Sequence, residues 1–264
     1  MRPEPDPPLG GYVVIDMSSG IAGAYCTKLL ADGGAEVIKV EPPGGDPLRG
    51  WSASGAETPD GADGALFSFL ACSKRSVIAA PDADDAFVDA LLAGAHGAIW
   101  SPGPGVAGSG RFAPEVIRQR HPHLTVTAIT SFGLEGPWKD KAATEFTLQA
   151  WSGGIVGLGR GAPDRAPVFV GGQVGDYLAG AYASAATMAL GVRLSFMISS
   201  WQTGRSSGAV ERLDRQLVIG VDADVGGDGH GLAGQRFGVL LIVDQRTRGG
   251  EGEIAAGSDR GDAV

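Results

Sequence analysis

The chain has 264 residues, of which 43% are hydrophobic, so it can bury the core of one large domain or two small ones. Its net charge of -9 and its sequence pI of about 4.9 argue against general affinity for nucleic acid or anionic membranes. These values favour chemistry on small molecules.

Two cysteines, Cys26 and Cys72, are too few for a disulfide scaffold or a cysteine-based zinc site. Each lies in an apolar stretch typical of ordered structure, so we expect both to be reduced and buried. Residues 1–10 are proline-rich, lack the apolar segment of a secretory signal, and are expected to be disordered. The apolar run at 237–243 is too short to span a bilayer, so we expect a cytoplasmic protein.

From residue 11 onward, strand patterns alternate with helix patterns. Residues 12–17 predict a buried strand, the spacing of Ile21, Tyr25 and Leu29 predicts a helix, and residues 35–41 predict a second strand. This order forms one βαβ unit. We therefore expect parallel strands joined by a right-handed crossover.

The later pattern continues the same alternation. The predicted elements are a short helix beginning at 67–70, a strand at 76–80, a helix at 84–94, a strand at 97–100, a helix at 114–120 and a strand at 124–132. This order is typical of an α/β fold with a Rossmann-like parallel sheet and flanking helices. The apolar face of the helix at 84–94 is expected to be Phe87, Leu91 and Leu92. The core is expected to contain Val13, Val14, Ile15, Leu29, Val37, Ile38, Val40, Ile78, Leu91, Ile99, Val126 and Ile129.

One carboxylate, Asp176, stands between a glycine-rich loop and an alanine-rich apolar run. The run predicts a helix that opens at Asp176, and Gly180 would let that helix pack closely on a neighbour. Asp176 is then either an N-cap, which aspartate favours, or a reactive group that a ligand reaches closely because glycines precede it. The core side of this helix is expected to carry Tyr177, Leu178, Tyr182, Ala186, Met188 and Ala189.

Other motifs give weaker signals. Gly103, Gly105 and Gly108 match the spacing of a dinucleotide-binding loop, but no convincing helix begins at Gly108, so a nicotinamide-dependent reductase is a minor alternative. The aspartates at 222–228 lack the ligands that a calcium loop requires, and the histidines show no convincing metal-ligand spacing, so we predict no metal site.

Lys74 and Arg75 precede a predicted strand and are expected at one edge of the sheet. They would either bind a phosphate group or remain solvated surface charges. Arg49, Arg111 and Lys141 are weaker candidates for the same role.

Beyond residue 193 the chain becomes polar and rich in turn formers. Two short apolar runs, at 217–221 and 237–243, are candidate strands. We otherwise expect residues 194–264 to form a divergent, poorly ordered tail that follows an α/β domain at 11–193.

Several stretches within residues 11–193 together resemble the class III CoA-transferase family, which is also called CaiB/BaiF-like and includes the related methylacyl-CoA racemases. The matching pieces are VVIDMSSGIAG, LLADGGAEVIKVEPPGGDPLR, CSKRSV, GAIWSPGPG, ITSFGLEGP, TEFTLQAWSGG and VGDYLAG. The combination is specific, although no single piece is.

The resemblance implies that Asp176, in GDYLAG, is the catalytic nucleophile. In such enzymes an ionised aspartate attacks an acyl-CoA thioester, forms a mixed anhydride and then an aspartyl-CoA thioester, and CoA passes to an acceptor carboxylate. CoA is thus a substrate and no cofactor is implied. Relatives form interlocked homodimers.

The resemblance also assigns binding residues by position. CoA contacts are implied at Ile21, Ala22, Ala71, Cys72, Ser73, Lys74, Arg75, Ser101, Pro102 and Gly103, with Arg111 as the nearest substitute for an adenine-side arginine. The acyl pocket is implied at Thr144, Glu145, Gly171, Gly172 and Gly175, where glycine N–H groups would bind a developing oxyanion.

Two departures from the family pattern define the alternatives. The racemase branch requires a histidine as a second base. In this sequence the matching positions are Thr144 and Glu145, so that base is absent, which favours a transferase over a racemase. Family members also continue far beyond the helix after Asp176, whereas this chain diverges, so we expect a truncated or frame-shifted product. A CoA-binding remnant without turnover is the alternative.

Overall fold

The computed structural model of this chain describes residues 6–79, 85–158, 164, 166–202, 216–221 and 239–243. In chain order the elements, with 3₁₀ helices labelled η, are β1 (Val13–Met17), α1 (Ile21–Asp32), β2 (Glu36–Glu41), η1 (Pro47–Gly50), α2 (Ala65–Ala71), β3 (Lys74–Ile78), α3 (Asp85–Ala93), β4 (Gly97–Trp100), η2 (Gly105–Ser109), α4 (Pro114–Arg120), β5 (Thr125–Ile129), α5 (Glu145–Trp151), η3 (Gly154–Gly157), α6 (Val174–Gln202), β6 (Gln216–Val221) and β7 (Val239–Val243).

A single sheet with strand order β3-β2-β1-β4-β5-β6-β7 organises the molecule. Its first six strands are parallel, and β7 pairs antiparallel with β6. The prediction of a Rossmann-like parallel sheet is therefore confirmed. Strands β6 and β7 correspond to the two apolar runs beyond residue 193. Because β1 lies between β2 and β4, a crevice for a ligand is expected at the carboxyl ends of β1 and β4.

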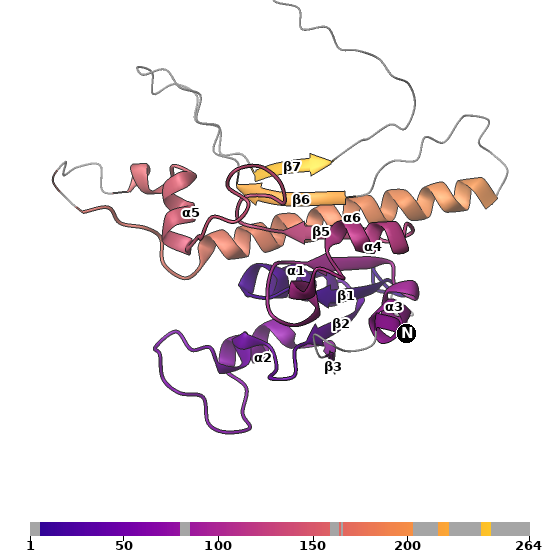
Figure 1. Cartoon of the computed structure of the whole chain (residues 1–264), viewed down its shortest axis with the longest axis horizontal. Helices are drawn as coiled ribbons and strands as arrows, with labels where there is room; N and C mark the ends of the chain where they lie inside the picture. The colour runs from indigo at the N-terminus through magenta and orange to yellow at the C-terminus, as the bar shows by residue number, and fades with distance from the viewer. Residues whose placement is uncertain are drawn as a thin grey trace, which may run out of the picture.

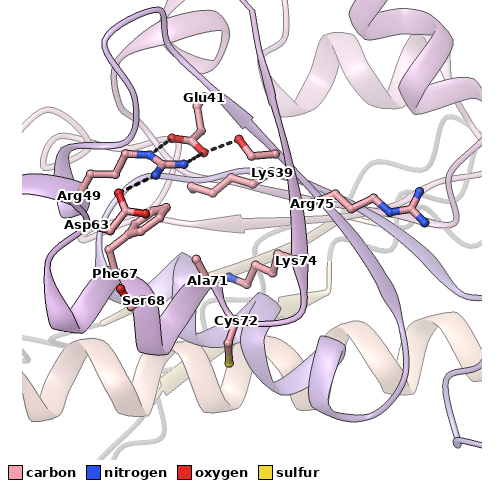
Figure 2. Close-up of a pocket in the computed structure, with 11 residues that line it drawn as sticks. Lys39, Glu41, Arg49, Asp63, Phe67, Ser68, Ala71, Cys72, Lys74 and Arg75 are labelled. Carbon is pink, nitrogen blue, oxygen red and sulfur yellow. Dashed lines mark hydrogen bonds and ion pairs between the residues drawn. The ribbon is translucent and has the colours of Figure 1, made fainter. Parts of the chain in front are cut away.

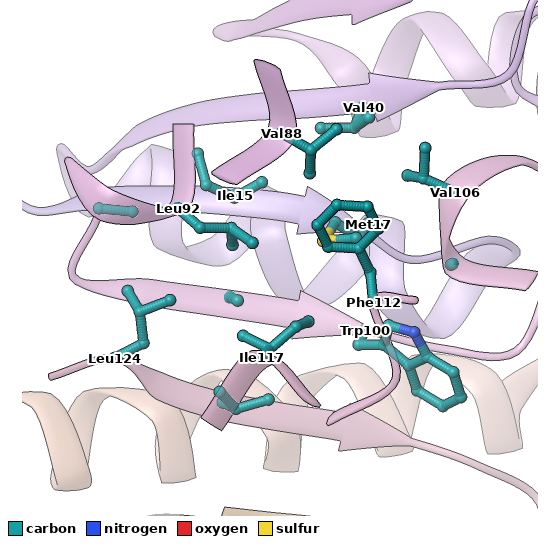
Figure 3. Close-up of a cluster of buried hydrophobic side chains, with 14 of the residues drawn as sticks. Ile15, Met17, Val40, Val88, Leu92, Trp100, Val106, Phe112, Ile117 and Leu124 are labelled. Carbon is teal, nitrogen blue, oxygen red and sulfur yellow. The ribbon is translucent and has the colours of Figure 1, made fainter. Parts of the chain in front are cut away.

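Helices cover both faces of the sheet (Figure 1). Strand residues alternate between two clusters, since Ile15 packs with α3 and α4 whereas Val14 packs with α1 and α6. Figure 3 shows the first cluster, in which Val88 and Leu92 of α3 lie close to Ile15. In the described part of the chain, no helix is long and apolar enough to cross a lipid bilayer.

Small residues form the contact between α6 and α1. A Cβ atom added to Gly180 would lie 2.5 Å from the carbonyl oxygen of Ala22, so Gly180 permits the close packing expected from the sequence. Ala183 and Ala186 are buried there, whereas Leu178 and Tyr182 are 53% and 50% exposed. The predicted core side of α6 was therefore wrong at these two positions, because the narrow contact admits only small side chains. It was also wrong at Ala189, which is exposed.

Two other residues predicted to face the core are exposed, and four predicted core residues are only half-buried, namely Val13, Leu29, Ile38 and Leu91. Ile78 is 64% exposed because β3 is the edge strand, and Phe87 is exposed because α3 turns Val88 and Leu92 inward. On α1 the fully buried side chain is Leu30, whereas Leu29 is half-buried.

The cysteine prediction was half right. Cys26 is buried, but Cys72, which follows α2, is exposed.

A buried hydroxyl pair joins α6 to β5 and gives a first prediction. Thr127 Oγ1 lies 2.7 Å from Thr187 Oγ1, and Thr187 donates to the carbonyl oxygen of Ala183 at 2.7 Å. We expect Thr187→Val to lower the free energy of unfolding in urea by about 1–2 kcal/mol, because it leaves the Thr127 hydroxyl without its partner. The double variant with Thr127→Val should recover part of the loss, and additive losses would contradict this explanation.

Candidate active site

The loops that follow β1 and β4 are bonded to each other at the expected crevice. The Ser19 N–H donates to Ser101 Oγ at 2.7 Å, and Ser101 Oγ donates to the Ser19 carbonyl oxygen at 3.1 Å. A Cβ atom on Gly103 would lie 2.7 Å from Ser19 Cβ, so only glycine fits there. Two stretches predicted to contact CoA, Ile21–Ala22 and Ser101–Gly103, therefore lie next to each other at the carboxyl ends of β1 and β4.

The glycines at 103, 105 and 108, whose spacing matches a dinucleotide-binding loop, form a tight turn here. Gly105–Ser109 forms a 3₁₀ turn, and the next helix, α4, begins only at Pro114. A Cβ atom on Gly108 would lie 2.4 Å from the carbonyl oxygen of Gly103, so this glycine closes the turn. No helix N-terminus is presented at Gly108, as the sequence indicated.

Asp176 lies in the first turn of α6, which begins at Val174 after Gln173 with a φ of 59°. It is the third helical residue and therefore not the N-cap. No described residue donates a hydrogen bond to its half-buried carboxylate. Burial, with a smaller contribution from the negative charge of Glu145, raises the pKa of Asp176 to about 6.

The packing of α6 on α1 places the Asp176 turn next to the start of α1. Tyr177 packs edge-on against Tyr25 with ring centroids 4.9 Å apart, and it contacts the cluster that contains Ile21. Gly180, one turn later, touches Ala22 and Cys26 of α1. The predicted nucleophile therefore lies beside the helix start at which CoA contacts are predicted.

Hydrogen bonds from Glu145 and its neighbour Gln149 connect α5 with the first turn of α6 and with Val170. Glu145 Oε1 accepts from the Gly175 N–H at 2.7 Å and from Gln149 Nε2 at 2.7 Å. Gln149 also bonds both backbone groups of Val170, at 2.8 and 2.9 Å. The other oxygen, Oε2, is buried without a hydrogen-bond partner in the described part of the chain. Sequence analysis missed Gln149, although its helical spacing of four from Glu145 was a usable signal.

The predicted acyl-pocket residues therefore divide into three groups. Gly175 needs to be glycine, because a Cβ atom would lie 2.8 Å from Glu145 Oε2, and its N–H is already bonded in this conformation. Gly171 and Gly172 have open space around them, and Gly172 has a φ of 78°. Thr144 is exposed and caps α5 by exchanging hydrogen bonds with Thr147.

The structure does not present the predicted cations as free phosphate ligands. Lys74 points inward, where its Nζ donates to Thr27 Oγ1 at 2.7 Å and lies near Asp16, so its charge is already paired and its phosphate role stays a prediction. The reason is that β3 begins at Lys74, two residues earlier than predicted, and this places Lys74 within the sheet. Arg75 is exposed, as expected at a sheet edge, and forms an ion pair with Glu36 at 2.8 Å.

The other basic candidates are also engaged. Arg111 forms an ion pair with Asp85 of α3. Arg49 binds Glu41 with two hydrogen bonds, of 2.7 and 2.8 Å, which together with bonds from other groups hold the pKa of Glu41 at about 2 despite its burial. The exposed Lys141 lies over the Trp138 and Trp151 rings, at 4.6 and 4.2 Å from the centroids.

A pocket of about 240 Å³ lies between α2 and the strands β2 and β3 (Figure 2). Ala71, Cys72 and Lys74 contribute to its lining, and Figure 2 shows the Arg75 side chain extending away from Lys74. Ser73 has a φ of 65°, which turns the chain sharply from α2 into β3. Within the stretch 71–75, the pocket is thus lined by Ala71, Cys72, Lys74 and Arg75, but not by Ser73.

Comparisons with known proteins agree with this arrangement. The family model of CoA-transferase family III matches residues 9–194. The succinyl-CoA–D-citramalate CoA-transferase of Chloroflexus aurantiacus is 35% identical over 184 residues, which cover 68% of this chain and 44% of that protein. The succinate–glutarate CoA-transferase of Agrobacterium fabrum is 35% identical over 193 residues, which cover 71% of this chain and 48% of that protein.

The structural comparison shows the same fold. A CaiB/BaiF family protein from Brucella suis, known from its crystal structure, has a TM-score of 0.60 and 30% sequence identity. The match covers 76% of this chain and 51% of that one. The chain therefore spans about half the length of this structure, and less than half of the two curated relatives.

Proposed function

Because the chain belongs to CoA-transferase family III, we propose that it moves CoA from an acyl-CoA to a carboxylic acid through Asp176. The observation that carries this proposal is the position of Asp176, a half-buried carboxylate without a described hydrogen-bond donor, in a turn that packs against the first turns of α1. Poor solvation leaves a carboxylate more nucleophilic than it is in water.

The proposed reaction cycle needs no oxidant or reductant and no group that donates or accepts a proton. An Asp176 oxygen attacks the thioester carbonyl carbon, the C–S bond breaks, and CoA leaves as its thiolate, so that Asp176 and the acyl group form a mixed anhydride. The thiolate then attacks the Asp176 carboxyl carbon, which releases the donor acid and leaves an aspartyl-CoA thioester. The acceptor carboxylate repeats these steps in reverse order. CoA thus acts as substrate, and the cycle uses no cofactor.

Two features support binding of the developing oxyanion near Asp176. The N–H groups of Gly171 and Gly172 have no acceptor among the described residues, and both glycines are exposed. Backbone donors of this kind stabilise oxyanions in acyl transfer. A racemase is less well supported, because Thr144, where that reaction would need a second base, is an exposed helix cap.

The proposal is tested by trapping the acyl-enzyme. Incubation of the chain with succinyl-CoA, chosen because one relative is named for this donor, and hydroxylamine should convert Asp176 to a hydroxamate. Mass spectrometry of the peptide that contains Asp176 should show this product, and incubation with free CoA and hydroxylamine is the control. If a labelled carboxylate acceptor receives CoA while this peptide stays unmodified, the proposed nucleophile is wrong.

The raised pKa of Asp176 predicts a pH dependence. The attacking form is the carboxylate, so the single-turnover rate of thioester cleavage should fall as the pH falls through about 6. Glu145→Gln should shift this midpoint to lower pH, because the negative charge of Glu145 is one of the two causes that raise the pKa. The exposed Glu57→Gln is the matched control and should leave the midpoint unchanged. An unchanged or higher midpoint in Glu145→Gln would contradict the coupling.

A further inference from the structure

Four charged side chains form a buried layer between β1–β3, α1 and the turn before η1. The side chains of Asp16, Lys39, Asp46 and Lys74 are each at most 3% exposed. Lys39 Nζ lies 3.8 Å from Asp16 and 2.8 Å from Asp46, and Lys74 Nζ lies 3.6 Å from Asp16. Two carboxylates balance two ammonium groups, so the layer is neutral as a whole.

This layer binds the backbone of Ser18, in the loop between β1 and α1. Asp16 Oδ1 accepts from the Ser18 N–H at 3.1 Å and from Ser18 Oγ at 2.5 Å, while Lys39 Nζ donates to the Ser18 carbonyl oxygen at 3.1 Å. A Cβ atom on Gly23 would lie 2.0 Å from Ser18 Oγ, so Gly23 must be glycine for Ser18 to reach Asp16. Both backbone polar groups of Ser18 are thus bonded to buried charges.

The same carboxylate also docks α1 onto the sheet. Asp16 Oδ2 accepts from Thr27 Oγ1 at 2.6 Å, and Lys74 Nζ donates to Thr27 Oγ1 at 2.7 Å and to the Ala24 carbonyl oxygen at 2.8 Å. Asp16 therefore connects to the loop that enters α1 and to the second turn of α1. These two connections set the position of Ile21, where the helix begins.

Stability alone does not explain why charges occupy this layer. Taking charged groups out of water costs several kcal/mol each, and apolar side chains of similar volume often stabilise a protein as well or better. Buried charges provide something different, namely short directional bonds to particular backbone atoms. The Lys39 and Lys74 charges, with hydrogen bonds from Ser18 and Thr27, hold the pKa of Asp16 below its ordinary value despite complete burial.

We propose that Asp16 is a positioning residue for CoA, because its buried carboxylate holds the Ser18–Gly20 loop and the start of α1 in the conformation that receives the ligand. The identification of the ligand as CoA rests on the proposed function. Asp16 itself does not reach the crevice, since it is completely buried. Its effect on CoA passes through Ser18 and Ser19, the latter bonded to Ser101 across the crevice.

The test compares CoA affinity with stability in matched variants. Asp16→Asn keeps the shape of the side chain but removes the charge that balances Lys39 and Lys74. Calorimetric titration with CoA should show a Kd raised about tenfold to 100-fold, the range expected when a binding group is misplaced by about an ångström. The control Thr187→Val loses a buried bond on α6 instead and should keep its Kd within about twofold of the original chain.

A double variant separates positioning from stability. Asp16→Asn combined with Lys74→Met restores the charge balance, so the free energy of unfolding should recover while the Kd for CoA stays above that of Lys74→Met alone, which is the control because Lys74 lies in a stretch predicted to contact CoA. A Kd that recovers together with stability would show that Asp16 has only a structural role and would overturn the inference.

Two further results distinguish this inference from the proposed function. If the original chain gives no heat of binding when it is titrated with CoA, the proposed function is wrong, and CoA is then not the ligand that Asp16 positions. If the original chain binds CoA and Asp16→Asn binds it equally well, only the inference fails. Should Asp16→Asn not fold, Ser18→Ala removes one bond to Asp16 and leaves every charge in place. A Kd raised in Ser18→Ala supports the inference, and an unchanged Kd overturns it.

Discussion

Asp176→Ala is expected to lower the single-turnover rate of thioester cleavage by at least about 1,000-fold, because removal of a covalent nucleophile leaves only binding and oxyanion contacts. Asp176→Asn should lose a similar factor, since an amide is a poor nucleophile. The measurement is release of free CoA thiol from succinyl-CoA with enzyme in excess. Asp60→Ala, which removes an exposed aspartate from a surface loop, is the matched control and should keep the original rate.

Asp176→Asn should also stabilise the fold at neutral pH. The folded pKa of Asp176 is raised to about 6 from an ordinary value of 3.8, so the folded state is penalised wherever the group is ionised in both states. This penalty is absent below about pH 4, grows as the pH rises to about 6, and is complete above it. Allowing for solvent screening, Asp176→Asn should raise the free energy of unfolding at pH 7 by about 1–2 kcal/mol.

These two measurements together distinguish a reactive carboxylate from a helix-capping one. A capping aspartate stabilises its helix, so its replacement lowers stability by about 1 kcal/mol. An Asp176→Asn chain that is less stable at pH 7 but cleaves succinyl-CoA at the original rate would therefore contradict the proposed role.

Gly180→Val should disrupt both the fold and the site. The added Cβ atom would lie 2.5 Å from the Ala22 carbonyl oxygen and 3.1 Å from the Cys26 nitrogen, and both are backbone atoms that do not move without shifting a helix. We expect the free energy of unfolding in urea to fall by about 2–3 kcal/mol. Asp176 lies one turn away, so the rate of thioester cleavage by the folded fraction should fall by about tenfold to 100-fold.

The control for Gly180→Val lies on the other side of the same helix. Ala185 is exposed, so Ala185→Val makes a comparable change without touching α1, and its stability should stay within about 0.5 kcal/mol of the original. If Gly180→Val and Ala185→Val behave alike, the α1–α6 contact does not position Asp176 as described.

Much of the fold could be predicted from local patterns. Short runs of apolar and β-branched residues identified β1, β2, β4 and β5, and the apolar runs at 217–221 and 237–243 identified β6 and β7, because strands buried on both faces are apolar along their whole length. The order of strands and helices was enough to predict a parallel sheet. The motif combination indicated the family that the comparison then showed for residues 9–194. The aspartates at 222–228 lie outside the described residues.

Errors arose where burial depends on distant parts of the chain. Lys74 and Cys72 are close in sequence, yet Lys74 turns inward because Asp16 and Thr27 bind it, and Cys72 stays exposed. Leu178 and Tyr182 were expected in the core because they are apolar, but α6 approaches α1 too closely for large side chains. Periodicity indicates that a helix has a buried side, whereas the shape of the neighbouring helix decides which residues occupy it.

The sequence by itself determined the order of the elements, the family and the identity of Asp176 as the candidate nucleophile, because each depends on residues that are near one another in the chain. Only the tertiary structure decided the pKa of that carboxylate. Glu145 precedes Gly175 by 30 residues, yet it bonds the Gly175 N–H and helps to raise the pKa of Asp176. Charge and desolvation act through space, so their effect on Asp176 is set by the packing of α5 and α6.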